Sequence, residues 1–153
     1  MTRFLLDTNI ISNVTKPAPS MSLITWMSEQ ADENLFIASL VVAELWRGIL
    51  ETPAGKRRTQ LERWFVGPEG PRALFAGRIL PFDEKASLIW ARLMAEGAKA
   101  GRPRSALDMI LAAVAEANNC IVVTDNEKHF QGLKLINPMR VVRPGEALRR
   151  IKP

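Results

Sequence analysis

At 153 residues the chain is long enough to bury the core of one domain, so we expect a single domain over 1–153. Its one cysteine excludes an internal disulfide, and no run approaches the roughly 20 apolar residues of a membrane span, so we expect a cytoplasmic protein without membrane contact. The net charge of +5 permits binding to nucleic acid or to an acidic partner, but by itself specifies neither.

Short apolar runs alternate with segments of helical periodicity along the chain. Strands are predicted at 3–6, 35–38, 79–82, 120–124 and 135–136. Helices are predicted at 8–15, from Ser20 or Ser22 to about 31, at 40–50 behind a Ser39 cap, at 55–65, from an Asp83 cap to about 100, and at 106–115 behind Ser105. A loop is predicted at 67–71, where glycines and prolines cannot continue a helix. The strands are solidly apolar rather than alternating, so we predict an α/β fold around a parallel sheet covered on both faces.

A group of polar residues follows the first predicted strand. The apolar run 3–6 leads into Asp7, Thr8 and Asn9, which puts the Asp7 carboxylate at the carboxyl end of a strand, where open α/β folds keep their sites. Thr8 and Asn9 would add hydroxyl or amide contacts there. The alternative is that Asp7 or Thr8 only caps the helix that follows.

Two further carboxylates lie in predicted helices among apolar neighbours. Glu44 follows the strand 35–38 by about one helical turn, and the alternative to a site role is a favourable charge near a helix N-terminus. Asp108 lies in the most apolar helix of the chain, where an unpaired buried carboxylate costs several kcal/mol and needs a cation, a hydrogen-bond network or a metal. The alternative for Asp108 is a capping box, because Ser105 and Asp108 match that pattern.

A fourth carboxylate, Asp125, follows the strand 120–124, although an Asp-Asn pair is also a common turn former. If the sheet is parallel, Asp125 and the three carboxylates above lie at the same edge of the molecule. Crowded carboxylates repel one another unless divalent cations neutralise them, and hard oxygen ligands favour Mg²⁺ or Mn²⁺.

Basic residues precede the third carboxylate. Lys99, Arg102 and Arg104 are our candidates for binding the phosphate backbone of a substrate. An acidic metal cluster with basic surroundings is typical of phosphodiester hydrolysis, in which two ions about 4 Å apart activate a water and stabilise the leaving oxygen. The only histidine, His129, is expected to be solvated or to make a local structural contact. The basic residues of the tail are expected to form a solvated terminus: Arg143, Arg149, Arg150 and Lys152.

Taken together, the motifs resemble those of PIN-domain ribonucleases, and more narrowly those of the toxin subunits of VapBC/FitAB-type toxin–antitoxin pairs. The resemblance covers essentially the whole chain and rests on four segments in order: Leu6-Asp7-Thr8-Asn9, Ser39-x-x-x-x-Glu44, Leu107-Asp108-Met109-Ile110-Leu111-Ala112-Ala113 and Val123-Thr124-Asp125-Asn126. It implies a three-layer α/β/α domain with a central, mainly parallel sheet. It also implies that Asp7, Glu44 and Asp108 bind Mg²⁺ or Mn²⁺, with Thr8 and Asn9 orienting Asp7 or a water.

The fourth position of the family pattern is open in this chain. Many relatives have Thr, any residue, then Asp or Asn, so either Asp125 or Asn126 would face the metal, with Thr124 beside it. Relatives also often have Asp-Phe where this chain has His129-Phe130. This departure affects a residue that would contact the metal ligands rather than the metal itself.

The resemblance further implies an activity and partners. The implied activity is metal-dependent endonucleolytic cleavage of RNA, with tRNA or rRNA as the expected target. The implied partner is a small antitoxin whose tail enters the active-site groove, where an arginine would compete with the metal, and whose other end binds promoter DNA. A homodimer is expected, and the helix 84–98, with Trp90, Leu93 and Met94, is a candidate for its surface, although core packing explains these residues equally well.

Two other classes of protein remain as alternatives. One is a DNA-associated regulatory subunit that works mainly in complex with its antitoxin and has little nuclease activity of its own. The other is a phosphoaccepting receiver-like domain with Asp7 at a strand end. The second is disfavoured because no lysine follows a late strand.

Overall fold

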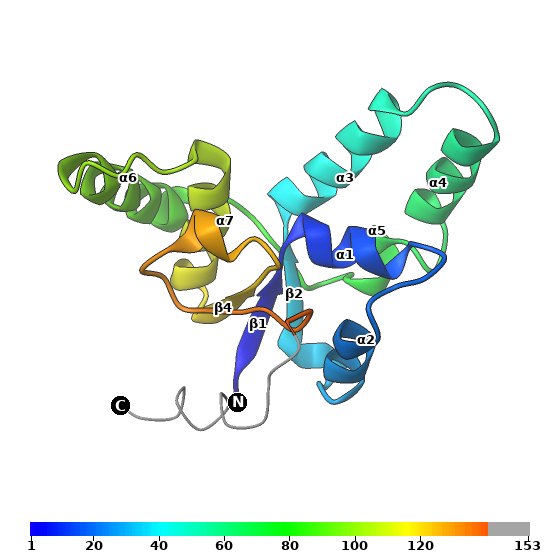
Figure 1. The fold of residues 1–153 in the computed structure, drawn as a ribbon, viewed down its shortest axis with the longest axis horizontal. Coiled ribbons are helices and arrows are strands. Elements are labelled where there is room, and N and C mark those ends of the chain that lie inside the picture. Colours follow the sequence, from blue (N-terminus) through cyan, green and yellow to red (C-terminus); the bar gives the residue numbers. More distant parts are fainter. Residues whose placement is uncertain (141–153) are drawn as a thin grey trace.

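The computed structural model describes residues 1–140 (Figure 1). The basic tail residues for which a solvated terminus is predicted lie outside the described residues: Arg143, Arg149, Arg150 and Lys152. The expectation of one domain over 1–153 therefore stays a prediction.

Five parallel strands form one sheet in the order β3-β2-β1-β4-β5. The strands are β1 (Arg3–Leu6), β2 (Leu35–Ala38), β3 (Ile79–Leu80), β4 (Cys120–Val123) and β5 (Leu135–Ile136). In the central pair, Leu6 lies opposite Val123, and the N–H of Asp7 donates to the carbonyl of Val123 at 2.9 Å. The residues that follow β1 and β4 therefore lie side by side at the carboxyl edge of the sheet.

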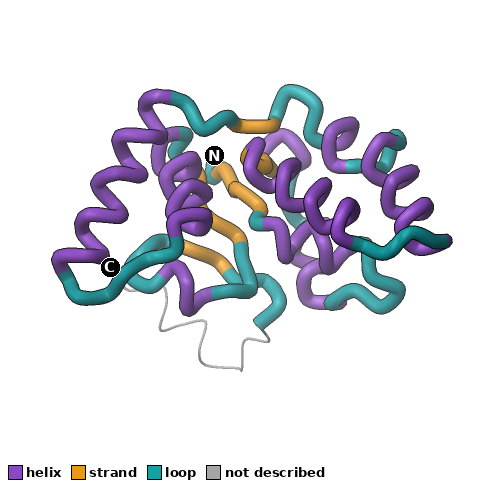
Figure 2. The backbone as a smooth tube through the Cα atoms, turned by 90° about the horizontal axis from the view of Figure 1, so that it is seen from above, coloured by secondary structure: helices purple, strands orange, loops and turns teal. Residues whose placement is uncertain are grey.

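Helices cover both faces of the sheet, as Figures 1 and 2 show from two directions. On one side lie α1 (Thr8–Val14), α2 (Met21–Ser28), α3 (Ser39–Glu51), α4 (Lys56–Val66) and α5 (Pro71–Leu74). On the other side lie α6 (Glu84–Lys99) and α7 (Ala106–Ala117). Short 3₁₀ turns occur at Asp32–Asn34 and Glu127–Phe130. The predicted α/β fold with a parallel central sheet is confirmed, and in the described part of the chain no helix is long and apolar enough to cross a membrane.

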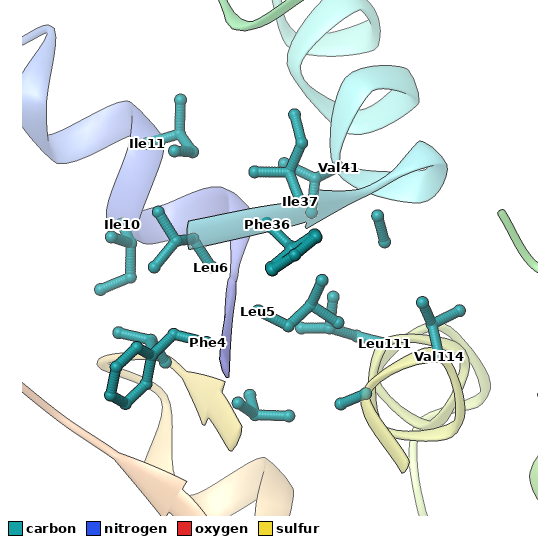
Figure 3. Packing of buried hydrophobic residues seen from close by; sticks show 14 of the residues in the cluster. Phe4, Leu5, Leu6, Ile10, Ile11, Phe36, Ile37, Val41, Leu111 and Val114 are labelled. Atoms are coloured by element: carbon teal, nitrogen blue, oxygen red, sulfur yellow. The ribbon is translucent and has the colours of Figure 1, made fainter. Parts of the chain in front are cut away.

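The core lies on both sides of β1 and β2, because these strands have apolar residues on both faces. Leu5, Leu6 and Ile37 are fully buried, and burial of each such side chain contributes about 1.5–3 kcal/mol. Figure 3 shows Leu111 and Val114 of α7 pointing into this core. The helix α7 is buried over most of its surface, as its continuous apolar sequence predicts.

Three of the predicted helix caps are confirmed. Ser20 accepts the N–H of Leu23, Asp83 accepts that of Ala86, and Ser105 accepts that of Asp108: the distances are 3.4, 2.9 and 3.3 Å. The predicted Ser39 cap is wrong by one position, because β2 runs directly into α3, so Ala38 is the cap residue and Ser39 begins the helix. Ala38 has no side-chain hydroxyl, and the cap therefore makes no side-chain hydrogen bond.

Some element bounds differ from the predictions. The residues from Pro71 form the short helix α5 instead of only a loop, since proline suits the first position of a helix. The third strand stops at Leu80, just before Pro81, which has no N–H to donate to a neighbouring strand. The second helix ends at Ser28 rather than near 31.

Gly70, at the start of α5, is a position where no side chain fits. A Cβ there would lie 2.2 Å from the carbonyl oxygen of Trp64 and 2.5 Å from that of Phe65. Because these are backbone atoms, Gly70→Ala should lower the free energy of unfolding by about 3 kcal/mol, measured by urea denaturation. Gly48→Ala in α3 is the control: a Cβ there meets nothing within 4 Å, so that variant should be more stable by about 0.5–1 kcal/mol. Equal effects of the two changes would contradict the prediction.

Candidate active site

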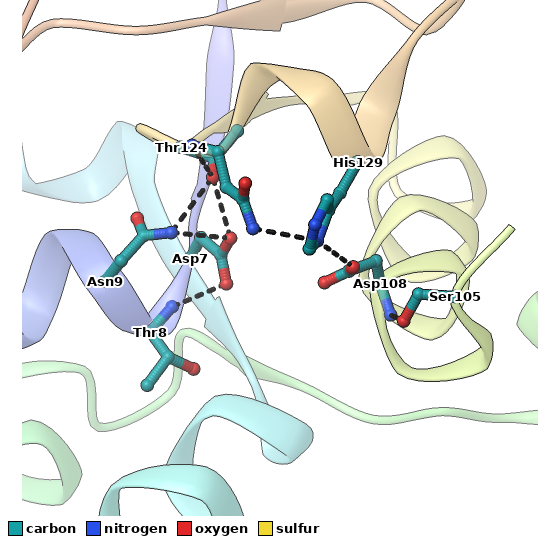
Figure 4. A network of polar contacts seen from close by, with 8 residues as sticks. Asp7, Thr8, Asn9, Ser105, Asp108, Thr124 and His129 are labelled. Atoms are coloured by element: carbon teal, nitrogen blue, oxygen red, sulfur yellow. Dashed lines mark hydrogen bonds and ion pairs between the residues drawn. The ribbon is translucent and has the colours of Figure 1, made fainter.

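Asp7 is held rigidly where β1 ends. Its side chain is buried, with 7% of the residue exposed. The N–H of Thr8 donates to Oδ1 at 2.7 Å, the hydroxyl of Thr124 donates to Oδ2 at 2.8 Å, and the amide of Asn9 donates to Oδ2 at 3.2 Å (Figure 4). Asp7 thus caps α1, as the capping alternative predicts, and also lies at the centre of a polar cluster. Its role as an active-site residue stays a prediction.

Thr124 joins the ends of β1 and β4. It is fully buried, and besides donating to Asp7 its hydroxyl accepts the amide of Asn9 at 3.1 Å and the N–H of Asn126 at 3.0 Å. The side-chain oxygen of Asn9 accepts the N–H of Asp125 at 3.3 Å. Thr124 and Asn9 therefore fix the loop after β4 against the start of α1.

Glu44 reaches the same cluster from α3. The hydroxyl of Thr8 donates to Glu44 Oε1 at 3.0 Å, while the N–H of Thr8 is bound to Asp7. One threonine therefore links two carboxylates that lie 37 positions apart in the chain. Glu44 is half-buried, in keeping with the apolar residues beside it in the sequence.

Asp108 lies in the first turn of α7. Its N–H donates to Ser105, which is one of the two hydrogen bonds of the predicted capping box, and its side chain is 23% exposed. Oδ2 lies 2.8 Å from Nδ1 of His129. Asp108 is therefore partly solvated and has a hydrogen-bond partner, rather than being an isolated charge in the core.

His129 is a site neighbour that the family pattern indicates only as a position and whose partners the sequence does not reveal. The expected local contact exists, but it reaches two residues of the predicted site: Nδ1 lies 2.8 Å from the Asn126 amide as well as from Asp108. A single Nδ1 cannot accept a hydrogen bond from Asn126 and donate one to Asp108 at the same time. The two contacts therefore exclude each other as simultaneous hydrogen bonds, so Nδ1 binds either Asn126 or Asp108 in a given protonation state.

The side chain of Asp125, the fourth predicted ligand, is exposed. Its backbone N–H contacts Asn9, and its charge acts on Asp7, while the neighbouring Asn126 is turned toward His129. The choice between Asp125 and Asn126 as the residue that faces a metal stays a prediction.

The basic residues before α7 are not equivalent. Arg104 donates to the carbonyl of Leu93 at 2.7 Å and lies 3.7 Å from the carboxylate of Glu96, so it holds the end of α6 in place. Lys99 and Arg102 are exposed, and neither forms a salt bridge with another described residue. Their role in binding a substrate stays a prediction.

Burial and mutual repulsion raise the pKa of two site carboxyls. For Asp7 burial is the largest cause, and the charges of Asp108 and Asp125 add to it, while the hydrogen bonds to Asp7 act in the opposite direction. For Glu44 burial is again the largest cause, and the charges of Asp7 and Asp108 add to it. The carboxylates therefore act on one another electrostatically, as the parallel sheet predicts.

The chemistry of these residues suits a hard divalent cation. All are carboxylates, and none of Asp7, Glu44 and Asp108 forms a salt bridge with a lysine or arginine among residues 1–140. No group of three acidic, histidine or cysteine side chains in that range is close enough to form a ready-made ion site. The fit to Mg²⁺ or Mn²⁺ therefore rests on donor type and charge rather than on a preformed cage.

Glu44→Gln should make the metal-free protein more stable at neutral pH. In the folded chain the pKa of Glu44 is raised above its ordinary value of 4.5. Between the ordinary pKa and the raised pKa, the folded state therefore binds more protons than the unfolded state. The contribution of Glu44 to the free energy of unfolding therefore falls as the pH rises between these two pKa values. It stays low at higher pH. We expect the variant and the original chain to have similar stability near pH 4 and the variant to be more stable at pH 7.5, by urea denaturation in a chelator. Glu33→Gln, at an exposed position, is the control; a Glu44→Gln variant that is less stable at pH 7.5 would contradict the prediction.

Comparison with known proteins identifies the family. The family model of the PIN domain matches residues 4–134, so the chain belongs to the PIN domain family. The VapC ribonuclease Y4jK of Sinorhizobium fredii is 39% identical over 136 residues, covering 88% of this chain and 96% of that protein. Toxin FitB of Neisseria gonorrhoeae is 33% identical over 126 residues, covering 82% of this chain and 89% of that protein. The resemblance to VapBC/FitAB-type toxins is therefore confirmed.

Solved structures agree with this assignment. The structure of FitAB bound to an IR36 DNA fragment matches with a TM-score of 0.83 at 30% identity, covering 92% of this chain and 98% of that one. The three-layer PIN-like fold implied by the sequence motifs is confirmed.

Proposed function

We propose that this chain is a metal-dependent endoribonuclease and the toxin of a type II toxin–antitoxin pair. The observation that carries the proposal is the grouping of Asp7 and Glu44 on Thr8, within the electrostatic reach of Asp108, at the carboxyl edge of a parallel sheet. The name of the VapC ribonuclease relative supports the same activity. Cleavage of RNA, with tRNA or rRNA as the target, follows as the proposed reaction.

Asp7, Glu44 and Asp108 would hold Mg²⁺ or Mn²⁺, and Asp125 is proposed as a fourth ligand. A divalent cation bound there would activate water for attack on the phosphodiester and stabilise the leaving oxygen. The chain's own hydroxyls prepare the site: Thr8 and Thr124 donate to the carboxylates and keep them oriented toward one another. Their hydrogen bonds oppose the rise in the carboxyl pKa values that burial causes, and this favours the ionised form that a cation needs.

The proposed partners are an antitoxin and a second copy of the chain. An antitoxin arginine would enter the acidic site, and contact with promoter DNA would occur only through the antitoxin complex, in the cytoplasm. The expected homodimer surface on α6 stays a prediction: Leu93 is buried, Trp90 and Met94 are half-buried, and Trp90 donates from its ring nitrogen to the carbonyl of Ala106 at 3.0 Å.

The proposal is tested by an RNA cleavage assay. The purified chain is incubated with total tRNA or with structured rRNA fragments, with Mg²⁺ or Mn²⁺ and with a chelator as the blank. We expect discrete cuts that need the metal. No cleavage under any of these conditions would contradict the proposal, and binding of promoter DNA by the antitoxin complex would then support the regulatory alternative.

A further inference from the structure

A second hollow opens directly from the candidate active site. It has a volume of about 270 Å³ and lies between α1, α3 and α4, the three helices seen together in Figure 1. We call it the α1–α3–α4 pocket. Thr8 and Glu44 are among the residues that line it, so the pocket shares two residues with the carboxylate cluster. Whatever occupies the pocket is therefore adjacent to the site of the proposed chemistry.

The lining of the pocket also includes two positively charged residues. Lys16, just after α1, and Arg57 of α4 line it, and both are exposed. Neither forms a salt bridge with any residue that the structure describes, whereas the neighbouring Arg58 is paired with Glu62 at 2.9 Å. Two cations without a salt bridge in the pocket that also contains Glu44 suit a ligand that carries successive negative charges.

The other residues that line the pocket are both polar and apolar. Thr8, Ser12 and Thr15 recur along one face of α1 and lead from the carboxylates toward Lys16, a span of about 10 Å at the rise of a helix. Trp64 of α4 adds an aromatic surface on the opposite side, of the kind on which nucleic-acid bases stack. The volume lies just below the range of about 300–1,000 Å³ found for small-molecule sites, which suits one nucleotide rather than a longer segment.

We propose that the α1–α3–α4 pocket binds the nucleotide next to the scissile phosphate of an RNA strand, with Lys16 and Arg57 bound to its phosphate. This inference rests on the proposed function, because the strand must pass from the carboxylates into the pocket. An acidic protein segment would also meet the two cations. The observation that favours RNA is that Glu44, a proposed metal ligand, lines the same pocket as these two basic residues.

Gly48 of α3 provides a way to close the pocket without damaging the fold. It lines the pocket, and a Cβ at this position meets no atom within 4 Å. Leucine favours a helix over glycine, so Gly48→Leu should leave the melting temperature unchanged or raise it while it occupies space in the pocket. Gly48→Ala is the small control.

The test measures the binding of a fluorescent, mixed-sequence, single-stranded RNA by fluorescence anisotropy. Binding is measured in the presence of Ca²⁺ and over a range of salt concentrations. A gel confirms that the RNA stays intact. We expect Lys16→Ala and Arg57→Ala each to weaken binding about fivefold and to reduce the slope of log affinity against log salt by about 0.7. Arg63→Ala, exposed on α4 outside the pocket, should change neither quantity. Gly48→Leu should weaken binding at least about tenfold, and Gly48→Ala much less.

Two results would overturn the inference. One is a Gly48→Leu variant that binds RNA as the original chain does; loss of antitoxin binding by the same variant would then assign the pocket to a protein segment. The other is an Arg63→Ala variant that weakens binding as much as Arg57→Ala, which would indicate a diffuse charge effect. If the original chain cleaves RNA while the pocket variants bind normally, only this inference fails. If the original chain neither binds nor cleaves RNA, the proposed function fails first.

Discussion

Replacing Asp7 with asparagine should lower the rate of RNA cleavage about a thousandfold while the chain still folds. Asp7 is the buried carboxylate of the site, and hydrogen bonds from Thr8, Asn9 and Thr124 fix both of its oxygens. Asparagine keeps the size of the side chain, but it removes the negative charge and one of the oxygens that would hold a divalent cation. The measurement is the initial rate of cleavage of a tRNA or rRNA fragment that the original chain cuts.

Asp32→Asn is the matched control, because Asp32 is exposed and outside the carboxylate cluster. It should cleave at the original rate, and Asp108→Asn should lose activity as Asp7→Asn does. Circular dichroism and a melting curve would establish that each variant is folded. Cleavage by folded Asp7→Asn at more than a tenth of the original rate would remove Asp7 from the site.

Thr124→Val should lower the free energy of unfolding by about 3 kcal/mol. Valine matches the shape of threonine, so the change removes only a hydroxyl that is fully buried. That hydroxyl donates to Asp7 and accepts from both Asn9 and Asn126. Leaving buried polar groups without a partner costs about 1–3 kcal/mol each, and more when one of them is charged. The measurement is urea denaturation in a chelator at neutral pH.

Thr124→Ser is the control for this prediction, because serine keeps the hydroxyl and loses only a methyl group. Its destabilisation should be smaller than that of Thr124→Val by at least about 1 kcal/mol. A valine variant as stable as the serine variant would show that the hydroxyl does not hold the ends of β1 and β4 together.

The sequence predicts the fold and the central carboxylates because both depend on local patterns. An apolar run such as Phe4-Leu5-Leu6 favours a strand covered on both faces, and the residue after such a strand lies at the edge of the sheet. Asp7 and Glu44 could therefore be placed near each other before any coordinates were known. The Thr8 hydroxyl between them could not, because it depends on how α1 packs against α3.

Contacts between distant segments account for what the sequence does not reveal. His129 reaches Asp108 only because the turn Glu127–Phe130 packs against α7, which no periodicity indicates. The same reason explains the basic residues: Arg104 looks as available as Arg102 in the sequence, yet its guanidinium is bound to the carbonyl of Leu93. Which basic side chains remain free to bind a substrate is decided only by how the helices pack.

The contact between Thr124 and Asp7 has a consequence for the synthesis of the protein. It joins residues 117 positions apart, so a growing chain contains Asp7 long before the residue that fixes its carboxylate exists. At about 5–20 residues per second, the ribosome needs roughly 6–23 s to add the intervening segment. Asp108 is also added late in that interval. A nascent or prematurely terminated chain that lacks Thr124 therefore cannot assemble the proposed catalytic centre.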